Sequence, residues 1–186
     1  MAFYDIDHQS RIVHLNELWS RLDDIEDLAM KDFQIGDLAQ DNNLKLLQTL
    51  VLFNFSNQAA REGSDAIDCY GHAWELKTCN SLLVSGFSTN HHTNHQRIAI
   101  FRQERWMFSI YEGIKLVDVY VMSPKMLEKE YFSKWESKID KLSETNTDNP
   151  HINNPKISIK FVRKNGIKVY PFSNPPIDPA EVLKNI

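Results

Sequence analysis

The sequence has few cysteines and no long apolar run, and both shortages limit what the protein can be. Its 186 residues include only Cys69 and Cys79, too few for a disulfide framework, so we expect free thiols and a cytoplasmic protein. The longest apolar stretches, such as 50–53, are far too short to span a bilayer, so no membrane partner is expected. The first seven residues are acidic and have no apolar core, so no secretory signal is expected.

Two common catalytic signatures are also missing. The chain has no Gly-x-Ser-x-Gly motif, and neither cysteine has an activating neighbour, which disfavours nucleophilic hydrolases. It has no phosphate-binding glycine loop either. The length, with 42% hydrophobic and 25% charged residues, is typical of one globular domain.

The charge of the chain is acidic overall but unevenly distributed. The formal net charge of −4 at first disfavours a nucleic-acid partner. Residues 1–34 carry eight acids and three bases, whereas 153–170 carry five bases and no acid. An acidic protein can therefore still present one basic face to phosphate, although charge alone favours a solvated, lysine-bearing hairpin.

The hydrophobic periodicity predicts a mixture of helices and strands. An amphipathic helix is expected over 15–28, and a second one beginning near Asp41-Asn42. The second helix is expected to bury four apolar residues: Leu44, Leu47, Leu50 and Val51. A third helix is expected to begin at Ser123-Pro124.

Strands and turns are expected between and after these helices. We predict strands at 66–68 and 73–78 around a turn at Gly71, a hairpin over 106–121, a loop over 143–155, and a hairpin over 157–170 that turns at Asn165-Gly166. The proline-rich tail from Pro171 is expected to be a surface extension. Together these elements predict one α/β domain.

The segment 61–77 carries the most informative chemistry. Alternate residues of a strand share a face, so Glu75 and Lys77 are expected to point the same way. The turn at Gly71 can bring Asp65 near Glu75. Two carboxylates suit Mg²⁺, and a lysine beside them can orient a water and stabilise charge on phosphorus. An acid followed by acid-x-Lys also occurs by chance, and a solvated amphipathic strand is the competing interpretation.

A histidine cluster offers a different metal site. His91, His92 and His95 are three of the seven histidines. Adjacent histidines on a strand point to opposite faces, whereas His92 and His95 could chelate zinc on a helix. No cysteine lies at finger spacing, so zinc is the weaker hypothesis.

Several short motifs, in one order, resemble a known family. The segment 61–68 followed by Glu75-Leu76-Lys77 is similar to the active-site stretch of PvuII-type restriction endonucleases, which belong to the PD-(D/E)xK nucleases. The resemblance runs from about Leu15 to Tyr170. Further matching motifs occur at 40–42, 45–48, 86–92, 102–103, 106, 132–136 and 152–156.

The resemblance implies the restriction-endonuclease-like fold, with a mixed central sheet flanked by helices, and a homodimer on palindromic DNA. Residues 1–170 would form one endonuclease domain. Within it, about 1–40 would serve dimerisation through the N-terminal helix, and 41–170 would serve catalysis and DNA recognition. Residues 171–186 would be a C-terminal extension.

The resemblance also implies roles for individual residues. Asp65, Glu75 and Lys77 would be catalytic, with Mg²⁺ held by Asp65, Glu75, the Leu76 carbonyl and, for a second ion, Glu62. DNA contacts would fall to six residues: Asp41, Ser88, His91, His92, Asn153 and Asn154. Imidazole and carboxamide groups can both donate to and accept from base edges.

The chain departs from the family pattern at two positions near these motifs. It has Asn90 before His91-His92, where the family has three consecutive histidines. It has Phe101 where the family has a tyrosine near the active site, and so loses a hydroxyl that could hold metal-bound water. These departures put binding of a second metal ion and the turnover rate in question.

Three functions follow from the pattern. The first is a type II restriction endonuclease; if the base-contacting residues act as in the family that the chain resembles, the resemblance implies CAGCTG as the site, cut bluntly to leave 5′-phosphates. The second is a DNA-binding module without catalysis, and intact Asp65, Glu75 and Lys77 disfavour it. The third is a structure-selective nuclease, and the intact His-His and Asn-Asn pairs disfavour it.

Overall fold

The computed structural model describes residues 6–58, 64–144, 149–184 and 186, and the chain divides into two compact units. The first unit is Met1–Leu47 and the second is Gln48–Ile186. No helix among the described residues is both long enough and apolar enough to cross a membrane.

The first unit consists mainly of one long helix, α1 (Ile6–Phe33). The helix ends at Phe33. The next residue, Gln34, has a φ of 57°, which lies in the left-handed region that is common just after a helix end. Four apolar side chains along α1 are 39–45% exposed: Leu18, Leu22, Ile25 and Leu28. The predicted apolar stripe therefore leaves a large part of each side chain open to solvent.

The second helix, α2 (Asn43–Phe53), begins where the sequence predicts it. Leu47 and Leu50 are buried as expected. The prediction for Val51 is wrong, because this side chain is 53% exposed and Thr49 is buried in the same turn. Thr49 and Leu50 take the buried side of this turn, and Val51, about 100° further round the helix, lies on the exposed side.

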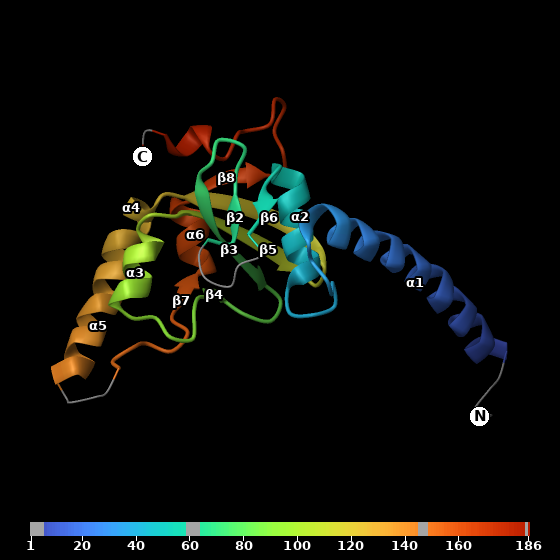
Figure 1. Ribbon diagram of the computed structural model, residues 1–186, viewed down its shortest axis with the longest axis horizontal. Coiled ribbons are helices and arrows are strands. Elements are labelled where there is room, and N and C mark those ends of the chain that lie inside the picture. Colours follow the sequence, from blue (N-terminus) through green and yellow to red (C-terminus); the bar gives the residue numbers. More distant parts are fainter. Residues whose placement is uncertain (1–5, 59–63, 145–148, 185) are drawn as a thin grey trace. The chain divides into compact units, whose positions relative to one another are not determined.

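The second unit is built on a six-stranded mixed sheet with the order β1-β2-β3-β5-β6-β8 (Figure 1). In the part of the chain that the structure describes, β3 and β5 pair in parallel and the other neighbouring strands of this sheet pair antiparallel. The strands are β1 (Ser56–Asn57), β2 (Ala66–Ile67), β3 (Ala73–Asn80), β5 (Arg105–Glu112), β6 (Lys115–Met122) and β8 (Ile167–Tyr170). The predicted α/β class and the hairpin of β5 and β6 are confirmed.

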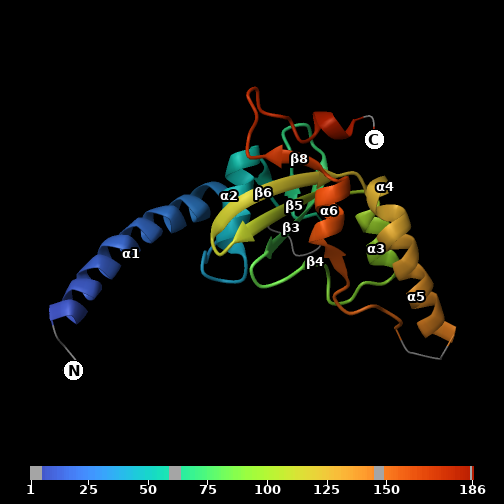
Figure 2. The same cartoon turned by 180° about the vertical axis from the view of Figure 1, so that it is seen from behind.

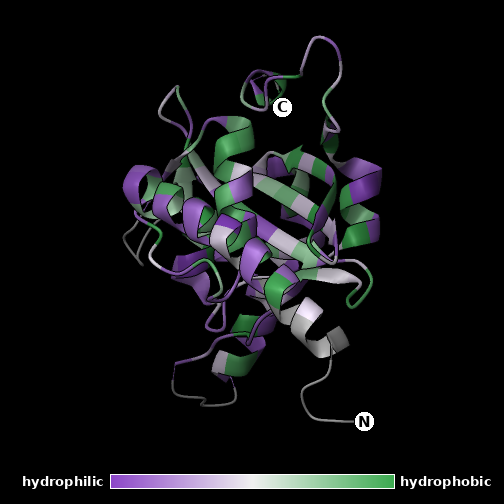
Figure 3. Cartoon of the chain, turned by 90° about the vertical axis from the view of Figure 1, so that its right-hand side faces the viewer, coloured by the Kyte–Doolittle hydropathy of each residue, from purple (hydrophilic) through white to green (hydrophobic). Residues whose placement is uncertain are grey.

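Helices cover the face of this sheet that carries the aromatic core. They are α3 (His95–Phe101), α4 (Pro124–Leu127), a π-helical turn (Glu128–Phe132), α5 (Ser133–Glu144) and α6 (Ile159–Asn165). Leu183 of a short 3-10 helix (Glu181–Leu183) is buried outside this core cluster. Figure 3 shows hydrophilic and hydrophobic residues alternating along the helices, as expected where one side packs on a core. Trp106 and Phe108 of β5 are fully buried in that core together with Phe132 and Val162.

A second, two-stranded sheet lies beside the main one. It pairs β4 (Gly86–Ser88) with β7 (Lys156–Ser158) in antiparallel fashion, with Ser88 opposite Lys156. We call this pair the β4–β7 ribbon. Figure 2 shows it next to α6, which directly follows β7.

The predicted hairpin over 157–170 is wrong. β7 pairs with β4, β8 pairs with β6, and α6 lies between them. Ile159 and Val162, three residues apart, both face the core, which is a helical arrangement. Gly166 has an extended φ of −77° and donates its N–H to the Val162 carbonyl, so Asn165-Gly166 ends a helix instead of forming a hairpin turn.

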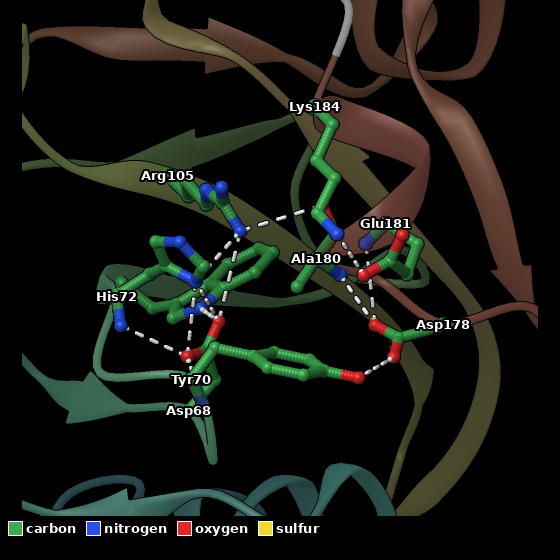
Figure 4. Close-up of polar contacts among 9 residues, drawn as sticks. Asp68, Tyr70, His72, Arg105, Asp178, Ala180, Glu181 and Lys184 are labelled. Carbon is green, nitrogen blue, oxygen red and sulfur yellow. Dashed lines mark hydrogen bonds and ion pairs between the residues drawn. The ribbon is translucent and has the colours of Figure 1, made fainter.

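The tail from Pro171 is more than a surface extension. Ala180 and Leu183 are buried, at 2% and 6% exposure. The Tyr70 hydroxyl donates to Asp178 Oδ2 at 2.8 Å, and Arg105 donates to the Ala180 carbonyl at 3.4 Å (Figure 4). A proline-rich composition predicts exposure, but these contacts hold the tail against the turn between β2 and β3.

Gly166→Ala should destabilise the protein, because an added Cβ would lie 2.8 Å from the Val162 carbonyl oxygen, a backbone atom that cannot easily move. We expect the free energy of unfolding in urea to fall by about 1–3 kcal/mol. Gly36→Ala is the matched control, since its Cβ meets only the flexible end of Met30, at 3.3 Å. Equal losses for the two variants would contradict this account.

Candidate active site

Asp68 organises the turn that joins β2 to β3. Its Oδ1 accepts the backbone N–H groups of Tyr70 and His72, each at 2.9 Å, and its Oδ2 accepts Trp74 Nε1 at 2.9 Å (Figure 4). Gly71 has a φ of +86°, which non-glycine residues rarely adopt. The turn therefore brings the residues before β2 back alongside β3, as the sequence predicts.

Asp65 lies directly beside the strand that carries Glu75. Its backbone N–H donates to the Trp74 carbonyl at 3.0 Å, and its Oδ2 accepts the Leu76 N–H at 2.8 Å. Burial and the nearby negative charge of Glu75 raise the pKa of Asp65 to about 6. The two carboxylates predicted to meet are thus placed together.

Glu75 and Lys77 project from the same face of β3. Glu75 is fully buried, and Lys77 Nζ lies 2.5 Å from its Oε1. Burial opposes the charge on Lys77, but Glu75 and Asp65 outweigh it and hold the pKa of the lysine above its ordinary value. Lys77 is therefore a protonated donor within a buried acidic site.

Two residues that the sequence did not single out complete this site. Arg97 of α3 places Nη2 3.3 Å from Glu75 Oε2. Glu104 is 3% exposed, and none of the described residues donates a hydrogen bond to its Oε2. Burial and the charge of Glu75 raise the pKa of Glu104 to about 7. Arg97 and Glu104 belong to no sequence motif with a characteristic spacing, so their place in the site becomes visible only in the folded chain.

Phe101 lies at the edge of the same site. Its ring is fully buried and makes an edge contact with Trp106 at 4.9 Å between centroids. The guanidinium carbon of Arg97 lies 4.8 Å from the centre of the Phe101 ring. This aromatic face therefore stabilises a cation that also contacts Glu75.

The oxygen atoms of this site suit a hard divalent cation, although the described residues form no complete metal-binding site. No group of three or more His, Cys, Asp or Glu side chains in the described ranges is arranged to hold a metal. Asp65 nevertheless places a partly buried carboxylate beside the fully buried carboxylate of Glu75, and Glu104 adds an oxygen that accepts no hydrogen bond from the described residues. Oxygen donors of this kind fit Mg²⁺. Glu62, the further predicted ligand, lies outside the described residues.

Predicted base-reading residues gather at one end of the β4–β7 ribbon. The Asn154 N–H donates to the Asn90 carbonyl at 3.1 Å, and Thr93 bridges to Ile152. His91 Nδ1 lies 3.4 Å from Asn153 Oδ1. Segments far apart in the sequence are therefore joined here by backbone and side-chain contacts.

The side chains at this end of the ribbon are mostly open to solvent. Four of the five predicted readers in the second unit are exposed: Ser88, His91, His92 and Asn153. Asn154 is partly buried, has a φ of 49°, and has a buried Oδ1 that accepts no hydrogen bond from the described residues. These groups offer both donors and acceptors on a surface.

The remaining predicted residues lie elsewhere. Asp41 belongs to the first unit, where it is exposed and has a φ of 49°. His95, the zinc alternative, instead contacts Asp140 at 2.9 Å through Nε2. The His92 ring lies 4.5 Å from that of His151.

The arrangement of two carboxylates and a lysine next to an exposed ribbon agrees with the comparison against protein families. The family model for restriction endonuclease PvuII matches residues 10–170, which include every element of this site. The family binds double-stranded DNA and generally requires a divalent metal. The chain therefore belongs to the PvuII family of restriction endonucleases and is a type II site-specific deoxyribonuclease.

Proposed function

We propose that this enzyme hydrolyses both strands of a short palindromic DNA site in a Mg²⁺-dependent reaction centred on Asp65, Glu75 and Lys77. One observation carries the proposal: the Asp65 carboxylate is fixed by the Leu76 N–H next to a buried Glu75 that contacts Lys77. The expected site is CAGCTG, cut bluntly at its centre to leave 5′-phosphate and 3′-hydroxyl ends. The enzyme would act in the cytoplasm.

Asp65, Glu75 and the Leu76 carbonyl would hold the metal, with Glu62 assisting a second ion. When bound, Mg²⁺ makes hydroxide accessible near neutral pH and offsets charge on the phosphoryl oxygens. The chain itself contributes Lys77, whose ammonium donates to the attacking water and to the charged phosphoryl group. Glu75 keeps that ammonium in place, and Arg97 balances the second oxygen of Glu75.

Base recognition is assigned to the end of the β4–β7 ribbon. His91 and His92 would read the major groove, supported by Ser88, Asn153 and Asn154. The Asn90–Asn154 backbone bond supports this role because it fixes the spacing of the two reading segments. Asp41 would accept from the guanine amino group in the minor groove.

A palindromic site calls for two copies of the chain. We propose a homodimer in which α1 contributes to the contact between subunits. The exposed apolar side chains along α1, Leu18 and Leu22 among them, support this assignment, since a dimer would cover them.

Asp65→Ala should abolish cleavage, because it removes a carboxylate from the centre of the acidic site. We expect a loss of about a thousandfold or more in single-turnover rate on a plasmid with Mg²⁺. DNA binding in Ca²⁺ should stay the same or improve, since one negative charge facing phosphate is gone. Glu112→Gln, at the exposed end of β5, is the control and should cut normally. Undiminished cleavage by Asp65→Ala would refute the assignment.

Sequencing the ends of plasmid cut by the wild-type enzyme separates the candidate functions. Blunt ends within one palindrome, CAGCTG, are the expected result. Binding without cleavage would indicate a DNA-binding module, and nicks that follow DNA structure would indicate a structure-selective nuclease.

The raised pKa values predict that the metal-free enzyme loses stability as pH rises. Asp65 and Glu104, with pKa values of about 6 and 7, bind protons more tightly in the folded chain than in the unfolded one. The protonated forms of these two groups give their full stabilisation below about pH 4. That stabilisation is lost as the pH rises through the pKa values of the folded chain.

Glu104→Gln tests this pH dependence. Measured by urea unfolding with EDTA, its stability relative to wild type should rise by on the order of 2 kcal/mol between about pH 4.5 and 7.5. Glu112→Gln should show no such rise, because its side chain is exposed. If the difference in free energy of unfolding between Glu104→Gln and wild type did not change with pH, the raised pKa of Glu104 would be refuted.

A further inference from the structure

A large open groove lies beside the β4–β7 ribbon. It encloses about 1120 Å³ and is formed by the turn 81–86 after β3, by β7 and by α6. Four cations line it and no acid does: Lys156, Lys160, Arg163 and Lys164. We call it the basic groove.

Most of the positive charge in the basic groove is not neutralised. Arg163 contacts Asp118 at 3.4 Å. Within the described part of the chain, Lys156, Lys160 and Lys164 form no ion pair with an acid. Glu130 lines a neighbouring hollow together with Lys160 and Lys164, but its carboxylate pairs with Lys134 at 2.5 Å. Three ammonium groups that pair with no acid of the described ranges therefore share one hollow in a protein of net charge −4.

The basic groove is continuous with the surface assigned to base reading. Lys156 lies opposite Ser88 in the ribbon and follows Asn153-Asn154 by two residues. The other wall, starting at Ser81, directly follows β3, the strand of Glu75 and Lys77. A duplex that contacts both the ribbon and the catalytic strand would continue toward this groove.

The spacing of the lysines suits an extended anion. Lys160 and Lys164 are one helical turn apart on α6, so their side chains lie along one face. Duplex DNA presents one negative charge per about 1.7 Å of its axis, so several ammonium groups can act on neighbouring phosphates.

The basic groove also has an apolar part, which could instead bind a protein partner. Leu82 and Leu83 are 69% and 79% exposed, and they could contact a protein partner. The absence of any acid among the lining residues, against four cations, favours a polyanion instead. DNA is the polyanion that this enzyme already binds.

We propose that the basic groove binds the phosphate backbone of DNA outside the recognition sequence. The proposal rests on the DNA-cleaving function assigned above and extends the contact surface beyond the base-reading residues. Phosphate binding in the basic groove makes the affinity depend on the length of the DNA and on the salt concentration. It leaves the recognition sequence unchanged.

The test compares two duplexes that carry the same cleavable palindrome. One is about 12 base pairs, roughly one helical turn, and the other about 30 base pairs, roughly three turns. Binding is measured in Ca²⁺ over a series of salt concentrations for wild type and for Lys160→Ala/Lys164→Ala. Lys138→Ala/Lys141→Ala, which removes two exposed lysines of α5, is the matched control.

The groove variant should bind the long duplex about tenfold more weakly and the short duplex almost normally. Its slope of log affinity against log salt on the long duplex should fall by about 3.6, because the two subunits of the proposed homodimer together lose four lysine–phosphate contacts and each contact accounts for about 0.9. Its cut site should be unchanged. Circular dichroism and cleavage of the short duplex confirm that the variant is folded.

Equal affinity of wild type and groove variant for the long duplex would overturn the proposal, as would equal losses on both lengths. A wild-type enzyme that cleaves no palindrome would instead refute the proposed function. The two failures are distinguishable, because the first appears in binding and the second in cleavage.

Discussion

The burial of the Glu75 carboxylate is the constraint on which the proposed catalytic face depends. A charge removed from water costs several kcal/mol unless opposite charges and hydrogen bonds compensate for it. Glu75 is fully buried, and Lys77 and Arg97 supply that compensation from two different elements. Helix α3 must therefore lie beside β3, and its first turn is fixed by Asn94, whose side chain accepts the Arg97 N–H. The need to compensate the buried charge of Glu75 therefore explains both the cations around it and the position of α3.

Local rules predicted the centre of the site and missed its surroundings. Strand alternation placed Glu75 and Lys77 on one face, and a glycine turn placed Asp65 opposite them; both depend only on neighbouring residues. Arg97 and Glu104 reach the site because β5 pairs in parallel with β3 after a crossover through α3. No spacing in the sequence records that crossover.

The wrong prediction over 157–170 has a similar origin. Asn-Gly between apolar runs is a strong hairpin signal when only neighbours are considered. Here Ile159 and Val162 have a core to pack against, and β4 and β6 offer separate edges to β7 and β8. Long-range packing outweighed the turn signal. The tail shows the same effect, since Asp178 meets Tyr70 from more than a hundred residues away.

The acidic cluster that suits a divalent cation also repels DNA. Asp65, Glu75 and Glu104 lie together in the region that phosphate approaches under the proposed mechanism. Cations placed inside the cluster reduce this repulsion, but they also occupy the oxygens that a metal needs, as Lys77 and Arg97 do at Glu75. Cations placed away from it attract the duplex without touching those oxygens. The separate placement of lysines along β7 and α6 therefore lets a protein of net negative charge combine the proposed acidic catalytic centre with a polyanionic substrate.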